Sequence, residues 1–129
     1  MCGIGGIISA SPKPFNYTAF CALGVTNDVR GGDSCGVFID GKYYYGIKEK
    51  RYFADAFKDI EILNTTEESQ IALVHCRKAS VGVIDHSTAQ PVIIAPNNKV
   101  EFVLLHNGTI YNYEDLAKKY IPNKRNSEI

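Results

Sequence analysis

The chain contains no tryptophan, a single methionine and no long apolar run, and its charges cancel. Because 14 Lys and Arg balance 14 Asp and Glu, no broad cationic face is available for nucleic acid. The apolar runs at 92–95 and 102–105 are far shorter than the roughly 20 residues that cross a bilayer, which argues against a membrane protein. The N-terminus has no Lys or Arg before Lys13 and is broken by glycines, unlike a signal peptide, so we expect a cytoplasmic location.

Disulfides and metals are also not expected. The four cysteines are Cys2, Cys21, Cys35 and Cys76. None of them forms a CxxC pair, so free thiols are predicted. A zinc site of Cys76, His75 and His106 is disfavoured because neighbours in a strand point to opposite faces. No metal and no cofactor are therefore predicted.

The 129 residues, 45% of them hydrophobic, fit one globular domain of the α+β class with mostly antiparallel strands. Periodicity and turn residues predict strands over 2–10, 37–39, 42–47, 71–77, 92–94 and 100–106. They also predict a helix from Asn16 to about Asp28, a short helix over 52–60, polar loops over 64–69 and 82–91, and a last helix capped by Asn112 and ended by Pro122.

Several local expectations follow from these elements. The first strand should be buried on both faces, with Ile4 and Ile8 on one face and Ile7 on the other. In the helix after Asn16, residues 20, 23 and 24 should form one apolar stripe. The Asp40–Gly41 pair predicts a hairpin, and the tyrosines at 43–45 within it should pack rather than bind bases.

Polar residues with special geometry end three of the predicted strands, and sites are often built at strand ends. Cys2 stands out because removal of Met1, which a small second residue permits, would leave a thiol and an α-amine on one residue. The amine could then accept the thiol proton, directly or through a water. By position alone, Cys2 could also be a buried structural residue, Arg77 an ordinary ion-paired arginine, and Asn107–Gly108 a simple turn.

Five motifs, MCGIGGI, RGGDSCG, HCRKAS, AQP and HNGTIYN, follow in order along nearly the whole chain. Together they resemble the class II glutamine amidotransferases, which are N-terminal nucleophile hydrolases. The resemblance implies two mostly antiparallel sheets between helical layers (αββα) and hydrolysis of the side-chain amide of L-glutamine. The ammonia would pass to a synthase subunit or domain outside this chain.

The resemblance also assigns the reacting groups. Cys2 would attack the amide carbon and form a γ-glutamyl thioester. Asn107, through its side-chain amide, and Gly108, through its backbone N–H, would form the oxyanion hole. Arg77 would grip the α-carboxylate of glutamine through its planar fork, and Ser80 would add a hydroxyl donor.

Further residues have supporting roles by the same resemblance. Arg30 and Asp33 would brace the loops around the nucleophile. His75 and His106 are expected to support the site rather than to act as the base, because the family needs no histidine base.

The chain departs from the family pattern at Asn126, where the segment RNSE replaces an SDTE-like segment. An asparagine in place of the aspartate that pairs with the substrate's α-amino group predicts weaker glutamine binding. The chain, taken as one glutaminase domain over 1–129, also looks C-terminally incomplete, and exposed sheet edges would then favour a homo-oligomer. Two alternatives stay open: a non-catalytic glutamine-binding or regulatory relative, and an amidase for another small amide.

Overall fold

A computed structural model describes residues 1–10, 13–57, 69–80 and 82–122. The strands are β1 (Gly3–Ile8), β2 (Ser34–Ile39), β3 (Lys42–Ile47), β4 (Ile71–Arg77), β5 (Val92–Ile94) and β6 (Phe102–Leu104). The helices are α1 (Tyr17–Asp28), α2 (Phe53–Phe57) and α3 (Tyr113–Tyr120), with short 3-10 segments at Lys48–Lys50 and Pro96–Asn98. All strand pairs in the described residues are antiparallel, which confirms the predicted α+β class.

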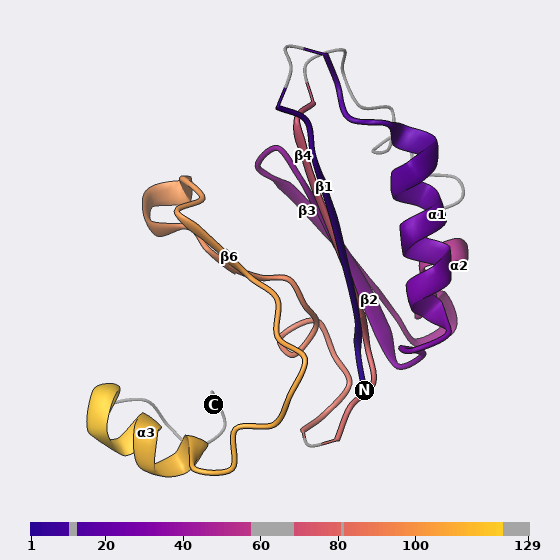
Figure 1. Cartoon of the computed structure of the whole chain (residues 1–129). Helices are drawn as coiled ribbons and strands as arrows, with labels where there is room; N and C mark the ends of the chain where they lie inside the picture. The colour runs from indigo at the N-terminus through magenta and orange to yellow at the C-terminus, as the bar shows by residue number, and fades with distance from the viewer. Residues whose placement is uncertain (11–12, 58–68, 81, 123–129) are drawn as a thin grey trace.

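The main sheet has the strand order β1-β4-β2-β3, so β4 is central. Gly3 of β1 lies opposite Cys76 of β4, and Ser34 of β2 lies opposite Arg77. This register gathers the start of β1, the start of β2 and the end of β4 at one end of the sheet, where the N-terminus lies (Figure 1). Residues far apart in sequence are thereby brought to a common edge.

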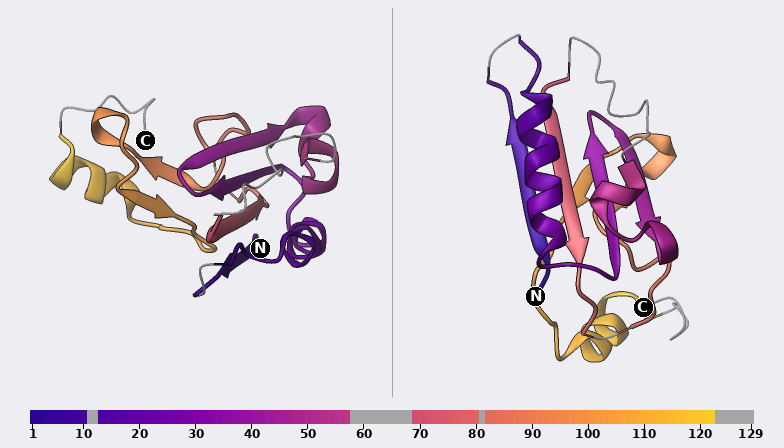
Figure 2. Two further views of the ribbon diagram at one scale, coloured as in Figure 1. Left: turned by 90° about the horizontal axis from the view of Figure 1, so that it is seen from above. Right: turned by 90° about the vertical axis from the view of Figure 1, so that its right-hand side faces the viewer.

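Three layers can be followed in the structure. Helices α1 and α2 cover one face of the main sheet, and the two-stranded β5–β6 ribbon lies on the other side (Figures 1 and 2). Helix α3 lies beyond the end of the sheet that carries the N-terminus (Figure 2). Among the described helices, none combines the length and apolar character needed to span a membrane.

The hydrophobic core lies between the helices and the main sheet. Phe20 of α1 and Phe53 of α2 meet edge to face, with ring centroids 6.1 Å apart, above the fully buried Val37 and Val74 of the sheet. Each such side chain contributes roughly 1.5–3 kcal/mol when fully buried. The core thus fixes the sheet, and the polar residues of the N-terminal, RGGDSCG and HCRKAS motifs lie at one end of it.

Helix α1 is held close to β1 by Asn27. A Cβ built on Gly3 would lie 2.7 Å from atoms of Asn27, and one on Gly5 would lie 2.8 Å from its Nδ2. The predicted cap is confirmed, since the Asn16 side chain accepts the backbone N–H of Ala19 at 2.9 Å. The predicted stripe is wrong at Leu23, which is exposed.

The buried face of α1 instead runs through Phe20, Gly24 and Asn27, which shows that it is set by contact with β1 and α2 rather than by apolar content. The expectation for the first strand is wrong in two ways. β1 begins at Gly3 and ends at Ile8, and its outer face is open: Ile4 is 43% and Ile8 70% exposed. Only the face of Ile7 packs on the core.

The β2–β3 hairpin is confirmed. Asp40 and Gly41 both have positive φ, 41° and 91°, as a two-residue hairpin turn requires. β2 starts at Ser34 rather than at residue 37, because residues 34–36 pair with both β4 and β3. Of the three tyrosines, Tyr45 is half-buried and donates to the carbonyl of Pro91, whereas the other two are substantially exposed.

The last strand is shorter than predicted. The strand predicted over 100–106 spans only Phe102–Leu104, and both of these end residues are more than half exposed because the ribbon has one open face. Helix α3 has its acidic residues in the first turn and its lysines in the last, which complements the helix dipole. Asn112 is the N-cap residue of α3, as predicted, but its side chain accepts no capping hydrogen bond.

The strands predicted over 71–77 and 92–94 are confirmed. The helix predicted over 52–60 is described only as Phe53–Phe57. Residues 58–60, the loop over 64–68 and Asn126 lie outside the described residues.

Candidate active site

A cavity of about 460 Å³ opens at the end of the main sheet, between the end of β4 and the segment that follows β6. Its lining includes Cys2, Arg77, Ser80, Gln90, His106 and Gly108. The structure therefore brings four of the predicted site residues, from three distant motifs, into one hollow. Asn107 joins them through a hydrogen bond to Cys2.

Cys2 lies at the inner wall of this cavity and is 9% exposed. Its Sγ lies 3.4 Å from the backbone nitrogen of Lys78, which donates to it. The carbonyl of Cys2 accepts the Nε–H of Arg30 at 3.3 Å. The thiol in turn lies 3.7 Å from the carbonyl of Lys78, to which it can donate, so both main-chain polar groups of that residue hold the sulfur in place.

The side chain of Asn107 lies next to the backbone nitrogen of Cys2. The N–H of Cys2 donates to Asn107 Oδ1 at 3.1 Å. Since Oδ1 is thereby engaged, the other branch of the amide, Nδ2, is the one that can donate elsewhere. Asn107 and Gly108 are both exposed, because the short β6 leaves this corner at the cavity rim.

Arg77 ends β4 and is 9% exposed. Its Nη1 donates to the carbonyl of Val83 at 3.1 Å and to Thr88 Oγ1 at 3.4 Å. Asp85 organises this loop by accepting the backbone N–H groups of Ser87 and Thr88, and its hydrogen bonds with the Ser87 hydroxyl and these amides lower the pKa of its carboxyl. The guanidinium is thus fixed at the cavity wall before any ligand binds.

Ser80 connects the two halves of the cavity. Its hydroxyl lies 3.2 Å from the hydroxyl of Thr109, across from the end of β4. Either oxygen can be the donor of this pair. Ser80 is exposed and lines the cavity, as a ligand-binding role requires.

Asp33 ties the loop after α1 to the segment after β4. Its Oδ2 accepts the backbone N–H of Ala79 at 2.8 Å, and its Oδ1 pairs with the ammonium of Lys78 at 3.4 Å. Its own N–H donates to the carbonyl of Arg77 at 3.0 Å. These contacts support the predicted bracing role, because they hold the Lys78 backbone where its N–H meets the sulfur of Cys2.

The two neighbours His75 and Cys76 point to opposite faces of β4, as predicted. The ring Nε2 of His75 lies 3.1 Å from the carbonyl of His106, whereas Cys76 Sγ lies 3.4 Å from Asp28 Oδ1 on the helix side. Burial and the nearby Asp28 carboxylate raise the pKa of the Cys76 thiol, and the same causes raise that of Cys35 to about 12. These buried thiols stay protonated, so they are poor nucleophiles.

His75 should make stability sensitive to acid. Burial, followed by the charges of Arg77 and His106, lowers its pKa, although the hydrogen bond to His106 acts in the other direction. Its stabilising contribution is therefore complete above the unfolded-state pKa of about 6.5 and is lost as pH falls through the folded-state pKa. Urea unfolding between pH 7.5 and 5 should show a steeper loss of stability in the wild type than in His75→Gln, by at most about 1.4 kcal/mol per pH unit. Equal slopes would contradict this.

Sequence reasoning missed several contributors to the site. The backbone N–H of Lys78 could not be recognised in the sequence, because every residue except proline carries such a group. Gln90, Thr109 and Tyr111 carry a weak signal, their places in the AQP and HNGTIYN motifs, whereas Tyr113 lies outside all five motifs.

Comparisons with known proteins agree with the motifs. No family model matches the chain, and no solved structure matches it significantly. It is 31% identical over 125 residues to a glutamine–fructose-6-phosphate aminotransferase (isomerizing) of Staphylococcus epidermidis. It is 30% identical over 121 residues to an amidophosphoribosyltransferase of Pasteurella multocida and 30% identical over 127 residues to that of Escherichia coli.

These matches cover 94%, 92% and 97% of the chain but 19%, 23% and 24% of the respective relatives. The chain therefore spans about a fifth to a quarter of the length of the curated relatives it matches. Near full coverage of the chain, together with the five ordered motifs, confirms the resemblance seen in the sequence. The chain is a homologue of part of the class II glutamine amidotransferases.

Proposed function

We propose that this chain is a glutaminase domain, over residues 1–129, that hydrolyses the side-chain amide of L-glutamine and passes ammonia to a synthase domain or subunit. The observation that carries the proposal is the meeting of Asn107 with the nitrogen of Cys2, 3.1 Å apart, beside a sulfur that receives a backbone N–H. After removal of Met1, that nitrogen would be an α-amine beside the thiol. The arrangement supplies a nucleophile, a base and an amide donor in one cavity.

The reaction follows from these groups. The α-amine of Cys2 takes the thiol proton, and the sulfur attacks the amide carbon of glutamine. The oxyanion that forms accepts hydrogen bonds from Asn107 Nδ2 and the N–H of Gly108. Collapse of the intermediate breaks the C–N bond, and the ammonium gives its proton to the leaving amide nitrogen, which departs as ammonia.

The second half of the reaction repeats the first with water. The γ-glutamyl thioester is attacked by a water that loses its proton to the same amine, and a second oxyanion uses the same donors. The carbon–sulfur bond then breaks, the thiolate regains its proton, and glutamate leaves. Arg77 and Ser80, on the cavity wall, would hold the α-carboxylate throughout.

The architecture supports a wider proposal about the fold. The β5–β6 ribbon on the face opposite α1 and α2 is where a second sheet of the αββα, N-terminal nucleophile hydrolase type would lie (Figure 2). In the described residues β1 is an edge strand with exposed Ile4 and Ile8, which is consistent with a homo-oligomer. A cytoplasmic location remains a prediction.

The direct test is glutamate release by protein that lacks Met1, verified by intact mass. We expect release of glutamate and ammonia in equal amounts, and loss of activity in protein that keeps one extra residue before Cys2, since a peptide nitrogen cannot accept the thiol proton. Equal activity of the blocked and free forms would contradict the proposed base.

The same assay separates the two alternatives that the sequence left open. A glutamine-binding or regulatory relative would be stabilised by glutamine without producing glutamate. An amidase for another small amide would turn over a des-amino analogue at least as well as glutamine.

A further inference from the structure

The main chain of His106 is held from both sides, immediately before the Asn107–Gly108 corner. Its N–H donates to Gln90 Oε1 at 2.7 Å, and its carbonyl lies 3.1 Å from Nε2 of His75. The side chains of Gln90 and His75, which belong to separate segments, therefore both bind the main chain of His106. Neither side chain has a role in the reaction described above.

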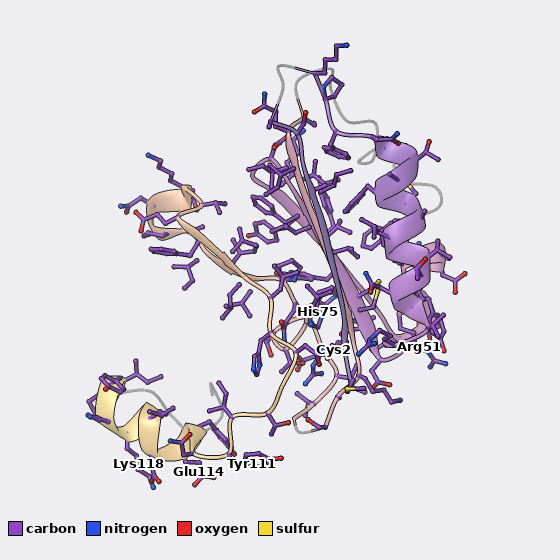
Figure 3. All side chains as sticks on the ribbon, viewed as in Figure 1. Cys2, Arg51, His75, Tyr111, Glu114 and Lys118 are labelled. Atoms are coloured by element: carbon purple, nitrogen blue, oxygen red, sulfur yellow. The ribbon has the colours of Figure 1, made fainter. Side chains whose placement is uncertain are left out.

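His75 is a rigid anchor. It is fully buried in the central strand β4, between Ile4 of β1 and Gly36 of β2, at the same end of the sheet as Cys2 (Figure 3). Because a carbonyl oxygen only accepts, the imidazole proton must lie on Nε2. Its Nδ1 then carries a lone pair, and it has no hydrogen-bond partner among the described residues.

Gln90 is anchored through its backbone. Its carbonyl oxygen lies so close to Gly36 that no side chain could be accommodated there, since a Cβ at that position would overlap the oxygen. Ala89 and Pro91 on either side are buried, and the hydroxyl of Tyr45 donates to the carbonyl of Pro91. The Gln90 side chain therefore reaches His106 from a fixed base on the main sheet.

We propose that Gln90 and His75 form a clamp on the main chain of His106. The clamp sets the position of the next two residues, Asn107 and Gly108, relative to Cys2. Apart from the clamp, the Asn107 side chain on the nitrogen of Cys2 also joins the corner to that end of the sheet. Among the described residues, no other hydrogen bond joins the main chain of residues 105–108 to the main sheet. This inference rests on the proposed glutaminase function and names two positioning residues for it.

The expected kinetic effect is on the chemical step. Donors to an oxyanion act mainly in the transition state, so a displaced corner lowers kcat more than it changes KM. A misplacement on the order of 1 Å can cost about a hundredfold in rate. Loss of one arm of the clamp should therefore lower kcat by about 10- to 100-fold.

The test compares Gln90→Met, which keeps the length of the side chain but lacks the acceptor, with Gln90→Glu, which keeps an acceptor oxygen. In Met1-free protein we expect Gln90→Met to lose about 10- to 100-fold in kcat with KM within about threefold, and Gln90→Glu to recover most of that loss. Gln70→Met is the matched control, because exposed Gln70 precedes β4 at the opposite end of the sheet. A Gln90→Met enzyme with wild-type kcat, or a Gln90→Glu enzyme as impaired as Gln90→Met, would overturn the clamp.

A measurement independent of turnover separates this inference from the function on which it rests. NMR should show a His106 amide protected from hydrogen exchange, an Nε2-protonated His75, and loss of the amide protection in Gln90→Met. A wild type that shows these signals but releases no glutamate would refute the glutaminase function and leave the clamp intact. A rapidly exchanging His106 amide in the wild type would refute the clamp.

Discussion

Cys2→Ala should reduce glutamate release by at least about a thousandfold, since removal of a covalent nucleophile leaves only the effects of binding and of the oxyanion donors. No other thiol can replace it. Cys35 and Cys76 are buried and have raised pKa values, and their side chains lie on the helix side of the main sheet. Initial rates of glutamate formation in Met1-free protein provide the measurement.

The matched control for that experiment is Cys21→Ala. Cys21 is a partly exposed free thiol on α1 and does not line the cavity. We expect its removal to leave the rate near that of the wild type. Residual activity of Cys2→Ala above about one per cent would exclude the thioester mechanism, whereas loss of activity in Cys21→Ala would indicate that the assay reports folding.

Asn107→Ala should lower kcat by about 100- to 1,000-fold, the usual cost of one oxyanion donor, with a much smaller change in KM. The substitution also removes the acceptor for the nitrogen of Cys2. The two roles can be separated by Asn107→Asp, which keeps an oxygen for that nitrogen and replaces the Nδ2 donor by a second oxygen. Steady-state kinetics of the three proteins provide the comparison.

Both variants are expected to be impaired if donation by Asn107 is what the reaction needs. Full activity of Asn107→Asp would instead show that the residue serves only to orient the α-amine. Because Asn107 is exposed, we expect both variants to fold as stably as the wild type, and urea unfolding of each variant checks this directly.

Local chemistry allowed much of the fold to be predicted from the sequence. The Asp40–Gly41 turn, the cap at Asn16 and the strand over 71–77 follow from short-range rules, and the structure contains all three. The wrong predictions concern which face of a helix or strand is buried, rather than where the helix or strand lies in the sequence. Ile4, Ile8 and Leu23 are exposed because burial depends on which layers meet, and that is decided by long-range packing.

In the candidate site, too, some contributors could be predicted from the sequence and others depend on the fold. Cys2, Arg77 and Gly108 could be selected by motif, and the structure places all three on one cavity. The Lys78 N–H could not be selected, because every residue but proline carries this group and only the register of β1 with β4 aims it at the sulfur.

Because Asn27 of helix α1 packs closely on Gly3 and Gly5, the helix fixes the register of β1 against β4. Slippage of β1 along β4 by two residues would keep every side chain on its face, yet it would carry the terminal sulfur about 7 Å along the strand. Larger residues at 3 or 5 would push the helix away, and the register of β1 would no longer be fixed. Turnover in this domain should accordingly depend on a helix that touches none of the reacting atoms.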